Sequence, residues 1–183
     1  MKKIIPNIIT ISRGITNIII IPLFFLDFPH KFVWIYVLFL YAACSDRLDG
    51  VLARKWKTIS DFGIVFDPLL DKILSLSLYM LLIPFNIIHS SIFIILLFRD
   101  LIVDGMKNFL LSRGKAVPAN NAGKIKMVFQ MVLINFALLY LIFPDQQWLQ
   151  QLTYISAFIA LFFAIKSIPN YFSTFYSFLK TNK

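Results

Sequence analysis

Six long apolar stretches, separated by short polar breaks, fill almost all of this 183-residue chain. They are found at residues 5–26, 33–54, 66–88, 91–112, 124–143 and 148–168. A helix needs about 20 mostly apolar residues to cross the hydrocarbon core of a bilayer, and each stretch is long enough. The sequence therefore predicts an all-α, polytopic membrane protein with six transmembrane helices.

The composition leaves little room for anything outside the membrane. Hydrophobic residues make up 59% of the chain, which is well above the usual share in a soluble domain. We therefore expect one domain, residues 1–183, with any chemistry located at helix ends. Lys2 and Lys3 precede an apolar run as in a signal peptide, but no small-residue cleavage site follows, so a retained first helix is predicted.

Basic residues are distributed unevenly over the breaks. If both termini are cytoplasmic, the outward breaks near 27–32, 89 and 144–147 contain only Lys31 of the eighteen Lys and Arg residues. Because cytoplasmic flanks carry the positive excess, this orientation is the predicted one. The net charge of +9 is expected to attract anionic membrane lipids, and no nucleic-acid partner is predicted.

The two ends of the chain are expected to carry short interfacial helices. Pro169 is predicted to break the sixth helix, because proline lacks a backbone N–H and its ring clashes with the preceding turn. The aromatic residues that follow would then suit a short helix lying in the interface as an anchor. His30 and His89 fall in outward breaks and are expected to be solvated loop residues.

Aspartate is concentrated in one segment of the chain. Residues 45–72 hold five of the nine acidic residues, and all nine are aspartate. Four of the five fall at helical spacing on either side of one cytoplasmic break. One face of the second helix carries Asp46, Asp49, Gly50 and Ala53, and one face of the third carries Gly63, Asp67 and Asp71. The two helices run antiparallel, so the four carboxylates are predicted to converge.

Converging carboxylates require a compensating charge, because like charges raise one another's pKa. Oxygen-only ligands favour Mg²⁺, Mn²⁺ or Ca²⁺ over zinc, and Mg²⁺ commonly combines carboxylates with substrate phosphates. Two such ions about 3.5 to 4 Å apart form a clamp for in-line displacement at phosphorus. The alternative is that the aspartates are solvated charges at helix ends, and we prefer that alternative for Asp61, which is off both faces.

The motif resembles the signature of the CDP-alcohol phosphotransferases. The match is Asp46-x2-Asp49-Gly50-x2-Ala53-Arg54-x8-Gly63-x3-Asp67-x3-Asp71, eight positions over 26 residues. The resemblance implies six transmembrane helices, a homodimer, a CDP-linked donor and two divalent ions, Mg²⁺ or Mn²⁺. It implies that the metal ligands are Asp46, Asp49, Asp67 and Asp71, with Asp71 also the general base. It implies CDP binding by Gly50, Ala53, Gly63 and Arg54, whose fork can pair two phosphate oxygens.

Two further segments resemble the phosphatidylglycerophosphate synthases of bacteria within this family. The first stretch does so through Pro6, Asn7, Thr10, Arg13 and Pro22, and this likeness adds Asn7 and Thr10 to the CDP-binding residues. The segment 98–130 does so through Arg99, Gly105, Lys107, Gly114, Lys115, Gly123, Lys124, Lys126 and Gln130. Three positions differ from the typical residue: Asp100 replaces Glu, Asp104 a small residue and Met127 Thr.

Charged residues interrupt the fourth stretch and continue into the break after it. Asp100, Asp104 and Lys107 recur at i, i+4 and i+7, a stripe expected to face away from lipid. Several cations suit an acceptor that carries a phosphate better than a zwitterion such as serine. The predicted acceptor-binding residues are Arg99, Arg113, Lys124 and Lys126. Binding of lipid headgroups by Arg113, Lys115 or Lys107 and a structural Arg–Asp pair at Arg99 stay open as alternatives.

The predicted reaction is phosphatidyl transfer from CDP-diacylglycerol to glycerol 3-phosphate, at the cytoplasmic face of a bacterial inner membrane. Asp71 would take the proton of the acceptor's primary hydroxyl, which attacks phosphorus as CMP departs. Other acceptors within the family, namely phosphatidylglycerol, serine or inositol phosphate, are alternatives. Divalent-cation transport is an alternative of another class, but it needs ionisable groups across the membrane, and the outer halves of the stretches supply almost none.

Overall fold

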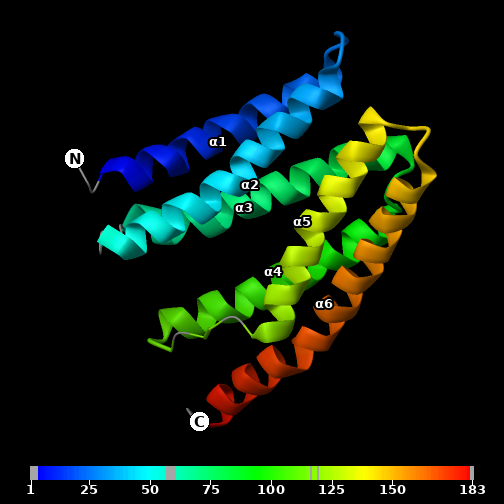
Figure 1. Ribbon diagram of the computed structural model, residues 1–183. Coiled ribbons are helices and arrows are strands. Elements are labelled where there is room, and N and C mark those ends of the chain that lie inside the picture. The colour runs from blue at the N-terminus through cyan, green and yellow to red at the C-terminus, as the bar shows by residue number, and fades with distance from the viewer. Residues whose placement is uncertain (1–3, 57–60, 116, 119, 182–183) are drawn as a thin grey trace. The chain divides into compact units, whose positions relative to one another are not determined.

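The computed structural model is helical throughout the residues that it describes. It describes the backbone of residues 4–56, 61–115, 117–118 and 120–181, and the side chains of residues 9–45, 69–115, 117–118 and 120–180. The elements are α1 (Ile4–Phe25), α2 (Lys31–Trp56), α3 (Asp61–Leu82), a 3-10 turn η1 (Ile83–Phe85), α4 (Ser90–Ser112), α5 (Asn121–Ile142) and α6 (Gln147–Thr181) (Figure 1). The predicted all-α class is therefore confirmed.

The chain forms two compact units. Unit 1 contains residues 1–81 and 138–146, and unit 2 contains residues 82–137 and 147–183. The first three helices therefore belong to unit 1, while α4, most of α5, and α6 belong to unit 2.

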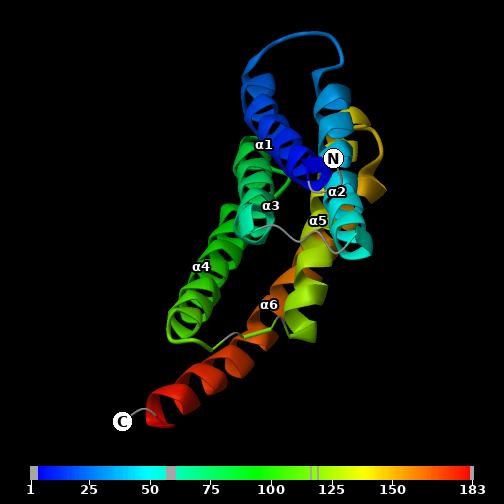
Figure 2. The same ribbon diagram turned by 90° about the vertical axis from the view of Figure 1, so that its left-hand side faces the viewer.

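An antiparallel hairpin of α1 and α2 forms part of unit 1 (Figures 1 and 2). At its turn, the rings of Phe24 and Phe32 meet edge to face with centroids 6.2 Å apart. His30 has a φ of 58°, a left-handed conformation that helps the chain reverse. Lys31 Nζ donates a hydrogen bond to Asp27 Oδ1 at 2.9 Å, and this bond with the lysine charge lowers the pKa of the exposed Asp27 carboxyl.

Close contacts also join α1 to α3 in unit 1. The Asn17 side-chain amide donates to the backbone carbonyl of Leu70 at 3.0 Å. One turn earlier, Gly14 faces the Leu70 side chain, and a Cβ on this glycine would lie 3.4 Å from Leu70 Cδ2. The two helices can therefore approach closely at Gly14. This close approach brings Arg13, the residue before Gly14, near α3.

In unit 2, α4 packs against α6 (Figure 1). The buried face of α6 is made mostly of small side chains, which let helix backbones approach closely without bulky groups between them. They are Thr153, Ser156, Ala157, Ala160, Ala164 and Ser167. The buried apolar residues of α4 include Leu96, Val103 and Leu110.

The connection from α4 to α5 is fixed at both ends by local hydrogen bonds. Gly114 has a φ of 77°, and the N–H groups of Gly114 and Lys115 return to the carbonyls of Leu111 and Leu110. This pattern is a Schellman motif, which ends a helix at a left-handed residue that glycine adopts without strain. At the other end, Asn120 Oδ1 accepts from the N–H of Gly123 at 2.7 Å and caps α5.

The distribution of polar and apolar side chains is that of a membrane protein. Large apolar side chains are exposed, for example Ile18 at 71% and Phe158 at 64%, whereas many polar ones are buried. The buried polar set includes Thr10, Arg13, Thr16, Asn17, Ser45, Arg99, Lys126 and Gln130. Ionisable groups in membrane helices are expected to face the protein interior. Within the described residues, α5 and residues Gln147–Lys180 are long and apolar enough to cross a membrane.

Two predicted boundaries were wrong. The third helix spans 61–82 and not 66–88, because Pro84 lies in η1 and cannot donate to a continuing helix, and Asn86 then turns the chain with a φ of 57°. The sixth helix does not break at Pro169 but continues to Thr181, so a separate C-terminal interfacial helix does not form. Tyr171, beyond the proline, is buried against other helices, and such packing offsets the lost hydrogen bond.

Candidate functional site

A fully buried arginine lies beside the described end of the aspartate motif. In unit 1, Arg13 Nη1 lies 3.5 Å from Asp71 Oδ1, with Arg13 0% and Asp71 15% exposed. Thr10, a predicted CDP-binding residue three positions before Arg13, is also buried. The polar face of α1 therefore meets α3 where the motif ends.

The rest of the motif is described only as backbone. Asp46, Asp49, Gly50, Ala53 and Arg54 lie on α2, and Gly63 and Asp67 lie on α3. Their side chains, and that of Asn7, are outside the described residues. The predicted helical spacing is thus present, while convergence of the carboxylates stays a prediction. Among the described side chains there is no group of three or more His, Cys, Asp or Glu that could hold a metal.

Sequence reasoning did not assign Arg13 to the site. The sequence did contain an indication, because a single arginine within an apolar stretch is costly in a membrane and needs a partner. The partner, however, lies 58 positions away, and no helical periodicity relates residues of different helices.

Replacing Arg13 by methionine is expected to destabilise unit 1. Removing one partner of a buried ion pair typically costs about 3 to 5 kcal/mol, because the other charge is left uncompensated. Thermal unfolding of the purified protein in detergent would measure the loss, and Lys166→Met, which removes an exposed cation, is the matched control. The double variant Arg13→Met with Asp71→Asn should recover part of the loss. Unfolding of Arg13→Met at the wild-type temperature would contradict the pairing.

Unit 2 contains a second buried group of charges, which we call the Asp100 cluster: Arg99, Asp100, Lys126 and Ser167. Lys126 Nζ lies 2.7 Å from both carboxylate oxygens of Asp100, and Arg99 Nη1 donates to Asp100 Oδ1 at 2.8 Å. Arg99 Nε donates to Ser167 Oγ at 3.1 Å, and Arg99 Nη2 donates to the same oxygen. Two cations thus share one carboxylate, a net charge of +1 in a largely buried place.

The Asp100 cluster joins two predicted acceptor-binding residues, Arg99 and Lys126, on α4 and α5. The Arg–Asp pair that was left open as an alternative for Arg99 is present. This ion pair uses only part of the hydrogen-bonding capacity of the Arg99 guanidinium, which has five N–H groups.

An aromatic residue of α6 adjoins this cluster. The Arg99 Cζ lies 5.7 Å and the Lys107 Nζ 4.9 Å from the centroid of the Tyr171 ring. The Tyr171 hydroxyl accepts a hydrogen bond from the backbone N–H of Asn120 at 3.0 Å. Lys107 was placed on the inward-facing stripe but not among the predicted acceptor-binding residues, and Tyr171 was expected to be an interfacial residue.

The other two predicted acceptor residues, Arg113 and Lys124, are both exposed. Arg113 lies over the ring of Phe109, with its Cζ 5.8 Å from the centroid. No described contact connects either residue to the Asp100 cluster. Near this loop, a pocket of about 300 Å³ is lined by Lys115, Val117, Pro118, Asn120, Asn170, Tyr171 and Thr174.

Substituting Gly123 by alanine is expected to disturb this region. An added Cβ would lie 2.9 Å from Asn120 Oδ1, 3.3 Å from the Tyr171 hydroxyl and 3.5 Å from Arg99 Nη2. Because Asn120 Oδ1 caps α5, its displacement should cost about 0.5 to 2 kcal/mol. Thermal unfolding would show the loss.

Gly105→Ala is the matched control for Gly123→Ala. Nothing lies within 4 Å of a Cβ at Gly105. This change should be neutral, or stabilising by about 0.5 to 1 kcal/mol, since alanine is the better helix former. Equal effects of the two substitutions would show that the crowding around Gly123 is unimportant.

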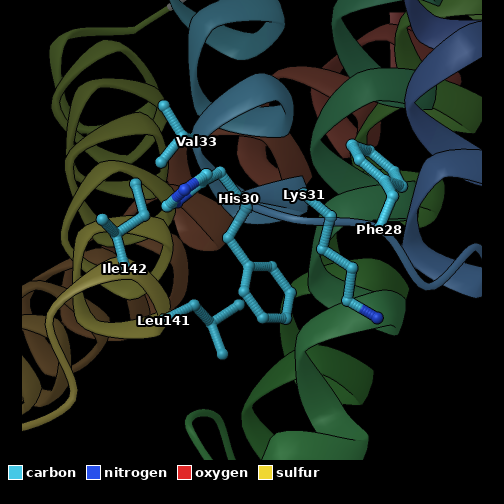
Figure 3. Close-up of a pocket in the computed structure, with 7 residues that line it drawn as sticks. Phe28, His30, Lys31, Val33, Leu141 and Ile142 are labelled. Carbon is cyan, nitrogen blue, oxygen red and sulfur yellow. The ribbon is translucent and has the colours of Figure 1, made fainter.

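A second pocket, of about 320 Å³, lies at the turn of the α1–α2 hairpin in unit 1 (Figure 3). It is lined by Phe28, His30, Lys31, Phe32, Val33, Leu141 and Ile142. Lys31 begins α2 and Asp46 follows fifteen residues later, about 22 Å along the helix at 1.5 Å per residue. The pocket is therefore at the opposite end of α2 from the motif and is not the candidate site.

Comparison with known proteins adds an independent line of evidence. Residues 3–166 match the family model described as CDP-alcohol phosphatidyltransferase. The match ends one residue before Ser167, so Tyr171 lies outside it.

Three similar proteins are each named CDP-diacylglycerol--glycerol-3-phosphate 3-phosphatidyltransferase. The Mycoplasma pneumoniae protein is 34% identical over 77% of this chain and 60% of its own length. The Bacillus subtilis protein is 29% identical over 97% of this chain and 98% of its own length. The Rickettsia prowazekii protein is 30% identical over 76% of this chain and 77% of its own length. The chain thus spans less than two thirds of the Mycoplasma protein but nearly all of the Bacillus one.

Proposed function

This chain belongs to the CDP-alcohol phosphatidyltransferase family, and on that premise we propose that it transfers a phosphatidyl group from CDP-diacylglycerol to glycerol 3-phosphate. The products are phosphatidylglycerol phosphate and CMP. The names of the Mycoplasma, Bacillus and Rickettsia relatives support this choice of donor and acceptor.

The Asp100 cluster is the observation that supports glycerol 3-phosphate as the acceptor. Two cations share one carboxylate there, so a positive charge is available in a place with little water. A phosphate monoester bears the complementary charge, and its oxygens accept charge-assisted hydrogen bonds from arginine and lysine. We assign Arg99 and Lys126 to the acceptor's phosphate. Arg113 and Lys124, which are exposed, attract the anion electrostatically.

The aspartate motif is assigned to the donor. Its four carboxylates, Asp46, Asp49, Asp67 and Asp71, are a hard oxygen donor set without His or Cys, which fits Mg²⁺ or Mn²⁺. Two such ions, when bound, would neutralise the charge of the donor's diphosphate. Gly50, Ala53, Gly63, Asn7 and Thr10 line the nucleotide pocket in this proposal, and Arg54 pairs the diphosphate oxygens.

Asp71 is the proposed general base. Its carboxylate accepts the proton of the primary hydroxyl of glycerol 3-phosphate as that oxygen forms a bond to the phosphorus bearing diacylglycerol. The bond from this phosphorus to the CMP oxygen breaks, and the electron pair leaves with CMP. The buried Arg13, 3.5 Å from the Asp71 carboxylate, holds it in place on α3. No protein nucleophile takes part.

The membrane arrangement is proposed from the same residues. We propose six transmembrane helices in one domain, with both termini in the cytoplasm. In this arrangement the aspartate motif and the basic residues Arg113 and Lys124 are on the side where a water-soluble acceptor is found. The bacterial inner membrane is the proposed location, with the active site facing the cytoplasm. A homodimer is the proposed assembly.

Release of CMP by the purified protein tests the proposal. CDP-diacylglycerol with Mg²⁺ or Mn²⁺ would be combined in parallel with glycerol 3-phosphate, serine, inositol phosphate or phosphatidylglycerol. We expect release with glycerol 3-phosphate alone. Release with a different acceptor would keep the donor and overturn the role of the Asp100 cluster. Absence of release with every acceptor would favour divalent-cation transport through the aspartates.

A further inference from the structure

Tyr171 is buried although its position in the sequence is typical of an interfacial anchor. It lies two residues beyond Pro169 in an aromatic segment, but only 4% of its surface is exposed. Its neighbours Phe172 and Tyr176 are 55% and 64% exposed and suit the lipid boundary. Tyr171 is therefore much less exposed than these two aromatic neighbours at the end of α6.

Two cations from α4 lie against the Tyr171 ring. The distances from the centroid are 5.7 Å for Arg99 Cζ and 4.9 Å for Lys107 Nζ. A cation within about 6 Å of an aromatic centroid is attracted by the ring quadrupole, and the attraction grows where water is excluded. Both cations are therefore attracted to the same ring.

The same side chain is fixed by its hydroxyl. Tyr171 accepts the backbone N–H of Asn120, which immediately precedes α5, at 3.0 Å. One helical turn earlier, Ser167 accepts from Arg99 on the same face of α6. Tyr171 thus ties the start of α5 to the two cations of α4.

Both cations retain donors for a ligand. In the described part of the chain, Lys107 makes neither an ion pair nor a hydrogen bond, so its contact is with the ring, which occupies no N–H group. Arg99 uses three described hydrogen bonds of the five that a guanidinium can donate. Together they offer several N–H groups beside the Asp100 cluster.

We propose that Tyr171 is a positioning residue of the acceptor site, and that it holds Lys107 and Arg99 so that both donate to the phosphate of the acceptor. Lys107 is thereby an additional phosphate-binding residue. This inference rests on the proposed function, since it concerns the same acceptor. It also gives α6 beyond Pro169 a role in specificity.

Steady-state kinetics of four variants test the inference. Tyr171→Leu removes ring and hydroxyl, Tyr171→Phe removes the hydroxyl only, and Lys107→Gln removes the second cation. Tyr176→Leu removes an exposed tyrosine of the same helix and is the control. The Michaelis constants for glycerol 3-phosphate and for CDP-diacylglycerol would be measured separately, together with competitive inhibition by inorganic sulfate, a tetrahedral dianion.

Tyr171→Leu and Lys107→Gln should each raise the Michaelis constant for glycerol 3-phosphate about tenfold, as expected from the loss of a partly desolvated cation–π contact or a charged donor. Inhibition by sulfate should weaken in parallel, while the constant for CDP-diacylglycerol stays unchanged. Tyr171→Phe should have a smaller effect, because the ring is retained, and Tyr176→Leu none.

An unchanged constant for glycerol 3-phosphate in Lys107→Gln, or in folded Tyr171→Leu, overturns the inference while the proposed function stands. Equal changes for both substrates would also overturn it, since they indicate a general structural role. If Tyr171→Leu does not fold, Lys107→Gln decides alone. Absence of wild-type turnover with glycerol 3-phosphate overturns the proposed function and the inference together.

Discussion

Asp71→Asn is expected to lower turnover by about 10³-fold, within the range that general acid–base catalysis contributes. The amide keeps the size of the side chain but cannot take a proton from the acceptor's hydroxyl. The substitution also removes one negative charge from the motif, which lowers the affinity of the motif for a divalent ion. The rate of CMP release from CDP-diacylglycerol and glycerol 3-phosphate measures the effect.

The control for this prediction is Asp145→Asn, the same chemical change at an exposed carboxylate before α6. It should leave the rate unchanged. Gel filtration in detergent would confirm that Asp71→Asn is inserted and folded, which matters because Arg13 loses a charged partner. Turnover of folded Asp71→Asn at the wild-type rate would exclude Asp71 as the base.

Arg99→Ala is expected to raise the Michaelis constant for glycerol 3-phosphate by about 10- to 100-fold. Hydrogen bonds to charged groups contribute about 1.5 to 3 kcal/mol, and each 1.4 kcal/mol corresponds to a factor of ten. The constant for CDP-diacylglycerol should change little, because no described contact connects Arg99 to the aspartate motif. Initial rates with each substrate varied in turn would separate the two constants.

Arg99→Lys refines this prediction. Lysine keeps the charge but cannot reproduce the two bonds to Ser167 together with the bond to Asp100, so an intermediate effect is expected. Lys166→Ala, which removes an exposed cation beside Ser167, is the control and should behave as the wild type. An unchanged constant for glycerol 3-phosphate in folded Arg99→Ala would remove this arginine from the acceptor site.

Much of the fold could be predicted from local patterns. The all-α class follows from the apolar stretches, and four of the six predicted helices match the structure to within a few residues at each end. The two larger errors both involve proline. Pro84 lies in η1, and the left-handed Asn86 turns the chain directly after it, so α3 ends early. Pro169 lies inside α6, and the helix continues past it, with Ser167 and Tyr171 buried on either side.

The sequence predicted the two parts of the site, the aspartate motif and the acceptor-binding residues, to different degrees. Family membership follows from residues within the span 46–71, because the spacing of the motif is a property of two adjacent helices. Arg99 and Lys126 were predicted as acceptor residues from their charge and from the resemblance of the segment 98–130, and the structure brings them together at Asp100. Arg113 was chosen for its charge and Lys124 also for the resemblance, but no described contact connects either residue to that cluster.

The sequence by itself determined that the chain is helical and apolar, that it belongs to its family, and that its acids gather at one break. Each of these depends on residues close together in the chain, or on composition. Only the tertiary structure decided that Arg13 meets Asp71 and that Tyr171 lies against Arg99 and Lys107. These contacts join different helices, and they depend on how helix faces pack, which the periodicity of a single helix does not specify.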